Sequence, residues 1–348
     1  MINILKSFVI TAILVASLFW NPFAKFEATA ADIPFGIAIH GGAGTINKEK
    51  LKGEVKRKYE QKLQQAVDAG YSLLKAGKSS QEAVIAAIQV LENSPLFNAG
   101  KGAVYTYEGE HELDASIMDG KTLNAGAVAG VKTVKNPIVL AKKVMDESVH
   151  VLLSGEGAQQ FAKEQGIAQI DNNYFDTEHR YQSLLRAKKK LEQAQKELKD
   201  FRAAHDSLAT EYKVGTVGAV ALDKDGNLAA GTSTGGMTAK RYGRVGDSPI
   251  IGAGTYANNA SCAVSATGHG EYFIRYHVAA DICARMQYQG VSLKEAADTV
   301  VNKVLKEAGG TGGIIAIDPA GNIAMPFNTQ GMYRASKSSN GQSTVSVF

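Results

Sequence analysis

Cysteine is scarce in this chain, and neither sign of charge dominates it. The 348 residues include 2 cysteines, 38 Lys+Arg and 34 Asp+Glu, which leaves a formal net charge of +4. Two cysteines cannot build a disulfide framework. Because Cys262 and Cys283 have no His or Cys at metal-ligand spacing, a zinc site is also excluded. We expect both to be buried small apolar residues. The weak, scattered positive charge argues against a nucleic-acid partner.

Long apolar runs are lacking except at the N-terminus. Lys6 precedes an uncharged, mostly apolar run from Phe8 to Trp20, and Ala28-Thr29-Ala30 gives the small-x-small pattern that signal peptidase accepts. We therefore expect residues 1–30 to be a signal peptide. The protein would be exported, periplasmic or secreted, with no membrane contact after signal removal. The alternative is a retained anchor, because residues 7–24 just reach the length that spans a bilayer.

Glycine is abundant, with 36 residues, and it separates short strand-like and helical segments. Such an excess without a G-X-Y period predicts many tight turns and close backbone approaches. Strand-like patterns lie at 35–40, 112–118, 125–131, 217–222, 228–234, 314–317 and 323–327. Helical spacing of apolar residues predicts helices at 59–74, 79–94, 137–147, 155–165, 271–289 and 292–307. This order is expected of a layered α+β domain.

Residues 177–213 differ from the rest of the chain, because they are rich in Lys, Glu, Gln, Arg and Ala and contain no glycine. Apolar residues at a and d positions over about three heptads are compatible with a coiled-coil dimerisation arm. They are Leu184, Ala187, Leu191, Ala194, Leu198 and Phe201. Since two of them are alanine and the repeat is short, we interpret the segment as a charged flexible linker, solvated and either helical or disordered.

The strand pair that follows the linker brings two threonines together. A hairpin about the loop 223–227 places Thr216 opposite Thr234. Taken alone, this pair indicates only a stable sheet, since cross-strand threonines are common. A threonine nucleophile also needs a base, and we interpret His40, in its glycine loop, as structural. Cleavage after Gly215 would supply a base, because the α-amine of an N-terminal threonine, with a pKa of about 7.7–8.0, can accept the hydroxyl proton.

Glycine-rich motifs follow one another from residue 38 to residue 271. In order they are Ala38-Ile39-His40-Gly41-Gly42-Ala43-Gly44, Phe97-Asn98-Ala99-Gly100, Glu112-Leu113-Asp114-Ala115, Met118-Asp119-Gly120, Gly126-Ala127-Val128-Ala129-Gly130, Gly215-Thr216-Val217-Gly218-Ala219-Val220-Ala221, Thr232-Ser233-Thr234-Gly235-Gly236, Gly243 to Pro249, Gly252-Ala253-Gly254-Thr255-Tyr256-Ala257 and Thr267 to Glu271. This series resembles the plant-type (type III) L-asparaginase and isoaspartyl peptidase family of N-terminal-nucleophile (Ntn) hydrolases. The resemblance covers almost all of the chain after residue 30, except the linker.

The resemblance implies a fold and an assembly. The fold would be an α+β, four-layer αββα sandwich made as an inactive precursor that cleaves itself between Gly215 and Thr216. Residues 31–215, with the linker at their end, would be the α subunit, and residues 216–348 would be the β subunit. Both would belong to one Ntn-hydrolase domain, over 31–348, and assemble as an (αβ)2 heterotetramer.

The resemblance also implies the catalytic residues. Thr216 would be both the autoprocessing residue and the hydrolytic nucleophile, supported by Thr234. The Thr267 hydroxyl and the Gly268 N–H would form the oxyanion hole, where preorganised donors stabilise developing negative charge. We do not expect His269 to be the general base, because the free α-amine already fills that role.

Substrate-binding residues follow from the same motifs. Arg244 would bind the substrate α-carboxylate as a planar two-pronged donor. Asp247 and the Gly270 carbonyl would hold the α-ammonium, and Asn98 would complete the set. Considered without the resemblance, Arg244 and Asp247 lie three residues apart in a glycine-flanked loop and could pair with each other at the surface.

A structural sodium ion is a further implication, although no cofactor is implied for catalysis. Its ligands would be mostly backbone carbonyls in the loop after the second helix. The corresponding residues are Leu91, Glu92, Ser94, Phe97, Ala99 and Lys101. An apolar residue is expected in place of Lys101, whose ammonium group would disfavour the ion only if it pointed into the loop.

The expected activity is hydrolysis of the side-chain amide of L-asparagine and of the isopeptide bond of β-aspartyl dipeptides, through a β-aspartyl-enzyme. An alternative with the same fold is glycosylasparaginase, which cleaves the GlcNAc-Asn bond. A non-catalytic exported protein that dimerises through residues 184–201 is an alternative of another class. It predicts a chain that stays intact.

Overall fold

The computed structural model describes residues 34–46, 48–49, 51–196 and 215–348, which belong to one compact unit. The signal peptide expected at 1–30 and residues 197–213 of the expected linker lie outside the described residues. Within the part of the chain that is described, no helix combines the length and apolar character needed to cross a membrane.

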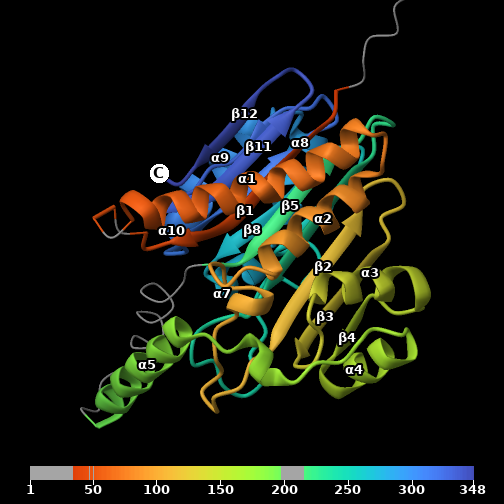
Figure 1. The fold of residues 1–348 in the computed structure, drawn as a ribbon. Coiled ribbons are helices and arrows are strands. Elements are labelled where there is room, and N and C mark those ends of the chain that lie inside the picture. Colours follow the sequence, from red (N-terminus) through yellow and green to blue (C-terminus); the bar gives the residue numbers. More distant parts are fainter. Residues whose placement is uncertain (1–33, 47, 50, 197–214) are drawn as a thin grey trace, which may run out of the picture. The chain divides into compact units, whose positions relative to one another are not determined.

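The larger of two sheets holds the strand that follows the linker near its centre (Figure 1). Its strand order is β12-β11-β1-β5-β6-β2-β3-β4. The bounds are β1 (Gly36–Gly44), β2 (Leu113–Asp119), β3 (Ala125–Val131), β4 (Leu152–Ser154), β5 (Val217–Leu222), β6 (Leu228–Thr234), β11 (Gly331–Ser338) and β12 (Ser343–Ser346). All neighbours pair antiparallel except β3 and β4. Strand β5 is buried along its whole length, as its apolar sequence predicts.

The smaller sheet has the order β10-β9-β8-β7 and packs on the larger one. Its strands are β7 (Thr255–Ala257), β8 (Ala263–Gly268), β9 (Gly312–Ile317) and β10 (Ile323–Ala324). Ala38, Val220 and Ala230 of the larger sheet meet Ala263 and Ile315 of the smaller one in a shared buried cluster. Larger side chains, among them Leu222, Leu228 and Ile317, complete this contact.

Helices cover the outer faces of both sheets. Helices α1 (Gly53–Lys75), α2 (Ser80–Glu92), α3 (Pro137–Glu147) and α4 (Gly155–Glu164) share a core with the larger sheet, and Figure 1 shows α1 and α2 lying across it. Helices α7 (Gly270–Arg275), α8 (Val278–Gln289) and α9 (Leu293–Thr299), and the π-helical turn η3 (Val300–Leu305), pack on the smaller sheet. The remaining short helices are η1 (Gly100–Gly102), η2 (Asn172–Phe175) and α10 (Lys306–Ala308).

Local sequence signals explain where several helices begin and end. Ser79 and Glu82 form the reciprocal capping box of α2, as their spacing predicts. Pro137 opens α3, where its missing N–H costs no hydrogen bond. The single helix expected over 271–289 is wrong in one respect: α7 and α8 are separate, because His277 takes a left-handed conformation with φ +48°.

Over its first half the charged segment is helical, one of the two forms we expected, with Glu178–Lys196 forming helix α5, but it is not a solvated, flexible linker there because one face is buried. Four of its a and d side chains are buried: Leu184, Ala187, Leu191 and Ala194. The first three pack in one cluster with Tyr105 and Ala239. Arg180, also buried, donates from Nε to the Gly102 carbonyl over 2.9 Å. The apolar spacing therefore marks a face that docks on the protein's own body.

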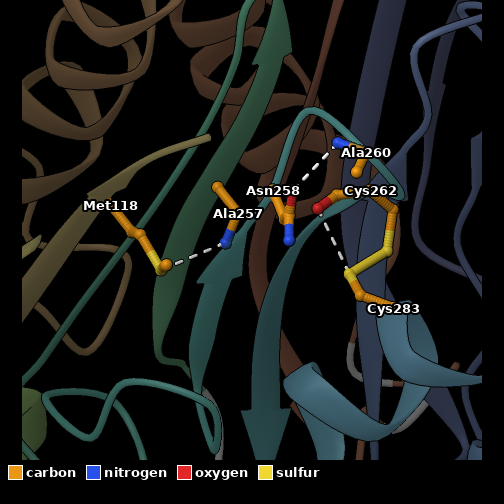
Figure 2. The surroundings of a disulfide bond; sticks show 6 residues. All are labelled: Met118, Ala257, Asn258, Ala260, Cys262 and Cys283. Carbon is orange, nitrogen blue, oxygen red and sulfur yellow. Dashed lines mark hydrogen bonds between the residues drawn. A yellow bond between two sulfur atoms is a disulfide. The ribbon is translucent and has the colours of Figure 1, made fainter. Parts of the chain in front are cut away.

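Cys262 and Cys283 form a disulfide with a Cα–Cα distance of 5.4 Å (Figure 2). Both residues are buried, as expected, but treating them as unlinked apolar residues is wrong. Cys262 directly precedes β8, and Cys283 lies within α8, which packs on that strand. Tertiary packing brings together two residues 21 positions apart, and nothing in their local sequence signals the pairing.

Candidate active site

Thr216 and Thr234 meet at one end of the β5–β6 hairpin. The register pairs Leu222 with Leu228 and Val217 with Ser233, as the loop length predicts. The Oγ1 atoms of Thr216 and Thr234 lie 3.1 Å apart. The Gly236 N–H donates to Thr234 Oγ1 over 3.0 Å, so the single proton of this hydroxyl is available to Thr216. The structure thus brings together the two threonines expected from the sequence.

The peptide bond before Thr216 is tightly enclosed. The Gly215 carbonyl accepts a hydrogen bond of 2.9 Å from the Asn98 N–H. Gly215 has φ +140°, and a Cβ on it would lie 2.5 Å from the Asn98 nitrogen. Gly42, with φ +108°, approaches from the β1 side, where a Cβ would lie 2.4 Å from the Gly215 Cα. Only glycines permit this conformation and this approach.

Asn98 also connects the loops around the pair of threonines. Its Oδ1 accepts from the Val104 N–H over 2.9 Å, and its Nδ2 donates to the Gly236 carbonyl over 2.7 Å. Its side chain therefore fixes the loop that supports Thr234. Asn98, which we expected among the substrate-binding residues, lines a cavity beside Thr216, and its backbone N–H donates to the Gly215 carbonyl.

A small cavity of about 20 Å³, room for about one water molecule, opens beside Thr216. Its walls contain every expected catalytic residue and three of the four expected substrate-binding residues. The lining is Ala43, Asn98, Gly215, Thr216, Thr234, Gly236, Arg244, Gly246, Asp247, Ser248, Thr267 and Gly268. Gly270 lies just behind it, where a Cβ would come within 2.9 Å of both Arg244 Nη2 and Asp247 Oδ1. Gly215, the residue before Thr216, is itself part of the wall.

The end of β8 supplies Thr267 and Gly268. The Thr267 hydroxyl accepts from the Ala43 N–H over 3.3 Å, which leaves its own proton free to be donated into the cavity. Gly268 is closely packed, since a Cβ there would lie 2.5 Å from the Phe273 ring and 2.6 Å from the Thr311 carbonyl. These contacts hold the backbone in place two residues before α7 begins at Gly270.

Arg244 is held by a partner that the sequence reasoning did not name. Its Nε donates to Glu271 Oε1 over 2.9 Å and its Nη2 to Glu271 Oε2 over 3.0 Å. Glu271 ends the motif 267–271, so the signal was present in the pattern without an assigned role. His269 Nε2 lies 3.3 Å from the same carboxylate. Glu271 therefore orients the guanidinium at the cavity wall.

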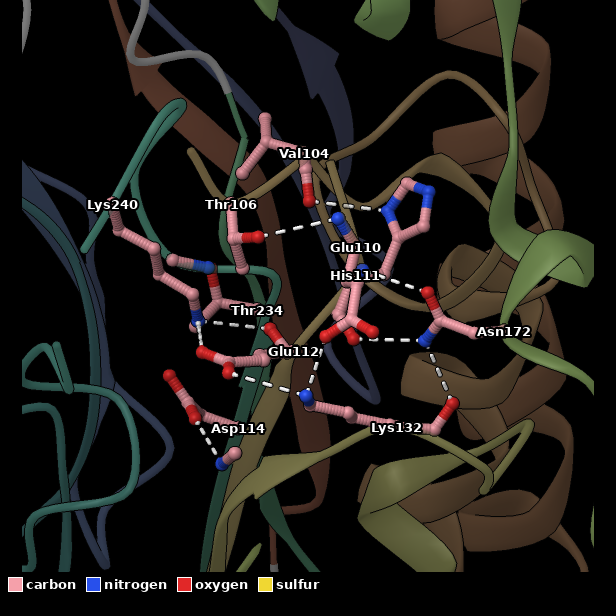
Figure 3. A network of polar contacts seen from close by, with 12 residues as sticks. Val104, Thr106, Glu110, His111, Glu112, Asp114, Lys132, Asn172, Thr234 and Lys240 are labelled. Carbon is pink, nitrogen blue, oxygen red and sulfur yellow. Dashed lines mark hydrogen bonds and ion pairs between the residues drawn. The ribbon is translucent and has the colours of Figure 1, made fainter. Parts of the chain in front are cut away.

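A buried lysine, which was also not predicted from the sequence, packs beside Gly236. Lys240 is 1% exposed and donates from Nζ to the Glu112 carbonyl over 3.0 Å (Figure 3). The Glu112 carboxylate lies 3.7 Å from the same nitrogen. A Cβ on Gly236 would come within 3.1 Å of Lys240 Nζ, so the lysine packs directly under the residue that donates to Thr234. Lysine in a buried position had no local sequence signal.

His40 is fully buried beneath Thr216. A carbonyl can only accept, so His40 Nδ1 donates to the Thr216 carbonyl over 3.0 Å, and Nε2 accepts from Ser265 Oγ over 3.0 Å. Burial lowers the pKa of His40 to about 3, against the smaller opposing effect of its hydrogen bond to Thr216. The ring is therefore neutral, and both nitrogens are already engaged, which is consistent with a structural role.

Comparison with known proteins identifies the family. Residues 33–347 match the family model described as Asparaginase. The chain is 54% identical over 299 residues to an isoaspartyl peptidase of Salmonella typhimurium, covering 86% of this chain and 94% of that protein. It is 46% identical over 319 residues to a putative isoaspartyl peptidase/L-asparaginase of Dictyostelium discoideum, covering 86% and 92%. It is 42% identical over 296 residues to an isoaspartyl peptidase/L-asparaginase of Xenopus laevis, covering 85% and 90%.

These matches define the chain as a hydrolase. It belongs to the asparaginase family, as its glycine-rich motifs predict.

Proposed function

We propose that the protein is an isoaspartyl peptidase and L-asparaginase that hydrolyses β-aspartyl dipeptides and L-asparagine through Thr216. The observation that carries this proposal is the Thr216–Thr234 hydroxyl pair, 3.1 Å apart, at the wall of a cavity that also contains Arg244 and Asp247. The names of the relatives support the same substrates. They do not favour the glycosylasparaginase alternative.

The finer description of the fold belongs to the same proposal. Two packed sheets with helices on both outer faces support a four-layer αββα sandwich. We propose that cleavage before Thr216 separates an α subunit, 31–215, from a β subunit, 216–348. The two subunits keep one shared core and assemble as an (αβ)2 heterotetramer.

The contacts of the Gly215–Thr216 bond support autoprocessing. Thr216 Oγ1 attacks the Gly215 carbonyl carbon, and the Asn98 N–H, already 2.9 Å from that carbonyl oxygen, stabilises the negative charge that develops. The C–N bond then breaks, the hydroxyl proton passes to the departing nitrogen, and an ester joins Gly215 to Thr216 Oγ1. Water hydrolyses this ester and leaves Thr216 with a free α-amine and a free hydroxyl.

Substrate hydrolysis reuses the same hydroxyl. The α-amine of Thr216 accepts the hydroxyl proton while Oγ1 attacks the β-carbonyl of the substrate. The Thr267 hydroxyl, whose proton is free, and the Gly268 N–H would stabilise the oxyanion. The leaving amine takes the proton from the Thr216 amine. Water then attacks the β-aspartyl ester and releases aspartate.

Arg244 and Asp247, which lie next to Gly270, would orient the substrate. Arg244, oriented by Glu271, would bind the α-carboxylate, and Asp247 with the Gly270 carbonyl would bind the α-ammonium. A side chain on Gly270 would collide with both groups, which is why the position must stay small. This arrangement would favour substrates whose aspartyl residue has both a free α-carboxylate and a free α-ammonium group next to the bond that is cleaved.

We also propose a structural sodium ion in the loop of residues 91–101. The Leu91 and Phe97 carbonyls accept N–H groups from Ser94 and Ala99, and each carbonyl oxygen keeps a second lone pair. The Lys101 ammonium does not occupy the loop, because it donates to the Tyr174 carbonyl and lies 4.7 Å from the Tyr174 ring. The expected donors therefore fit the ion, which would stiffen the loop that carries Asn98.

Export is proposed on the N-terminal pattern of residues 1–30. The Cys262–Cys283 disulfide supports it, because disulfides persist mainly in oxidising compartments such as the periplasm or the exterior. N-terminal sequencing of the secreted protein tests this proposal. Cleavage before residue 31 is expected, and a chain that keeps residue 1 would contradict it.

Hydrolysis of β-Asp-Leu, L-Asn and GlcNAc-Asn by the purified protein tests the substrate proposal. We expect turnover of the first two and none by Thr216→Ala. Activity on the glycoside alone would favour glycosylasparaginase instead. Arg244→Ala should raise KM steeply while chain cleavage still proceeds, since Arg244 contacts the substrate carboxylate and not Gly215. An unchanged KM would contradict that role.

A further inference from the structure

A chain of buried hydroxyl groups runs between the two sheets beneath Thr216. Starting from His40 Nε2, it passes to Ser265 Oγ (3.0 Å), Thr232 Oγ1 (2.6 Å), Thr255 Oγ1 (2.6 Å) and Ser116 Oγ (2.7 Å). All five side chains are 0% exposed. They come from β1, β8, β6, β7 and β2, so the chain crosses between the larger and the smaller sheet four times.

The neutral His40 ring fixes the direction of the first hydrogen bonds in this chain. His40 Nδ1 donates to the Thr216 carbonyl, so the neutral ring must accept at Nε2 from Ser265. Ser265 gives its single proton to His40, so the link between Thr232 and Ser265 needs the Thr232 proton, and Thr255 donates to Thr232. The Ser116 proton is shared between Thr255 Oγ1, 2.7 Å away, and the Ser248 carbonyl, 2.6 Å away. In a low-dielectric interior, such a directed series is mutually polarised, and breaking one link leaves buried groups unsatisfied.

The far end of the chain touches the loop that carries Asp247. Ser116 Oγ lies 2.6 Å from the Ser248 carbonyl, and Thr232 Oγ1 lies 3.0 Å from the Gly254 carbonyl. Gly254 in turn packs on Asp247, since a Cβ there would lie 2.4 Å from the Asp247 carbonyl. The chain thus connects the backbone of Thr216 with the backbone of the loop 247–254.

The chain passes next to Gly218, where a side chain would leave it no room. A Cβ on this residue would lie 2.0 Å from Ser265 Oγ and 2.4 Å from His40 Nε2. Gly218 lies in β5 two residues after Thr216, which directly precedes the strand, so a Cβ on Gly218 would face the same side as the Thr216 side chain. The beginning of β5 therefore packs directly against the hydrogen bond between His40 and Ser265.

We propose that His40 and the hydroxyl chain are positioning residues that set where Thr216 lies relative to the loop 247–254. The inference rests on the proposed function, because it concerns the same site. Chain cleavage makes this role important: an N-terminal Thr216 has a covalent neighbour on one side only. The hydrogen bond to its carbonyl then fixes the direction of its Oγ1 together with β5. Small displacements of a reacting group are known to cost large factors in rate.

The test replaces one link of the chain and compares it with a matched control. Thr255→Val removes a linking hydroxyl without changing the side-chain shape, and Thr255→Ser restores it. Thr238→Val is the control, because the buried Thr238 hydroxyl has no hydrogen-bond partner among the described residues. Ser265→Ala removes a second link and adds no volume.

We expect Thr255→Val and Ser265→Ala to lower kcat for β-Asp-Leu about tenfold or more at 25 °C, with Thr255→Ser and Thr238→Val within about twofold of wild type. The unfolding midpoint of each of the four variants is measured as well. A substitution that only destabilises the fold would lower this midpoint but leave kcat unchanged at temperatures well below the midpoint. Wild-type kcat in folded Thr255→Val and Ser265→Ala would overturn the inference. So would an equal loss in Thr238→Val, or failure of both chain variants to fold while Thr238→Val folds. A wild-type protein inactive on all three substrates would instead overturn the proposed function.

Discussion

Removing the Cys262–Cys283 disulfide, by the double substitution Cys262→Ala and Cys283→Ala, should destabilise the protein measurably. The bond closes a loop with a sequence separation of 21. For a loop of that length, the lost constraint on the unfolded chain is worth about 3 kcal/mol. With an unfolding entropy of about 2.1 cal/mol/K per residue, this lowers the midpoint of thermal unfolding by about 4 °C in a chain of this size.

Differential scanning calorimetry with and without dithiothreitol measures the effect. The wild-type midpoint should fall in dithiothreitol, and that of the double variant should not change. Activity at 25 °C should be unaffected, because Cys262 precedes β8 at the end opposite Thr267. The reasoning would be refuted if the double variant had the same unfolding midpoint as the oxidised wild type. It would also be refuted if dithiothreitol lowered the midpoints of both proteins equally.

Three further outcomes are expected. Leu184→Ser, at a 2% exposed position of α5, should lower the free energy of unfolding in urea by about 2–5 kcal/mol, whereas Leu185→Ser, 42% exposed, should change it by less than about 0.5 kcal/mol; equal effects would contradict docking of α5. The His40 pKa falls from 6.5 to about 3 on folding, so its contribution to stability is complete above pH 6.5 and is lost as pH falls toward 3. Between pH 5.5 and 4.5, the free energy of unfolding of wild type should fall by about 1.4 kcal/mol more than that of His40→Asn; an equal fall in both proteins, measured by urea denaturation, would argue against this. Gly218→Ala should cost about 1–3 kcal/mol of stability and lower kcat, whereas Gly157→Ala, with open space around it, should do neither; wild-type kcat and stability in Gly218→Ala would exclude the close packing at Ser265.

Local sequence patterns were sufficient for most of the elements and for the centre of the site. The loop 223–227 fixes the hairpin register, and that register places Thr216 opposite Thr234. The capping box at Ser79 and the proline at 137 fix where α2 and α3 begin. These features depend on residues close together in the chain, which is why they could be predicted.

Contacts between distant residues were not predictable from the single sequence. The disulfide, the Arg244–Glu271 pair and the buried Lys240 each require knowledge of which elements pack together. The hydroxyl chain is a stronger example, because serine and threonine are ordinary strand residues and only the packing of five strands lines up their side chains. The docked face of helix α5 was not predicted because alanines at two of its a and d positions weaken the apolar stripe, although Ala187 packs in one cluster with Tyr105 and Ala239.

The central claim is that Thr216 cleaves its own chain and then acts as the nucleophile. Intact-mass spectrometry of purified wild type and Thr216→Ala, with N-terminal sequencing of every fragment, tests it most directly. The account predicts that wild type separates into two fragments, the second beginning at Thr216, and that Thr216→Ala stays a single inactive chain. A wild type that is active as one intact chain, or a Thr216→Ala variant that is still cut after Gly215, would contradict it.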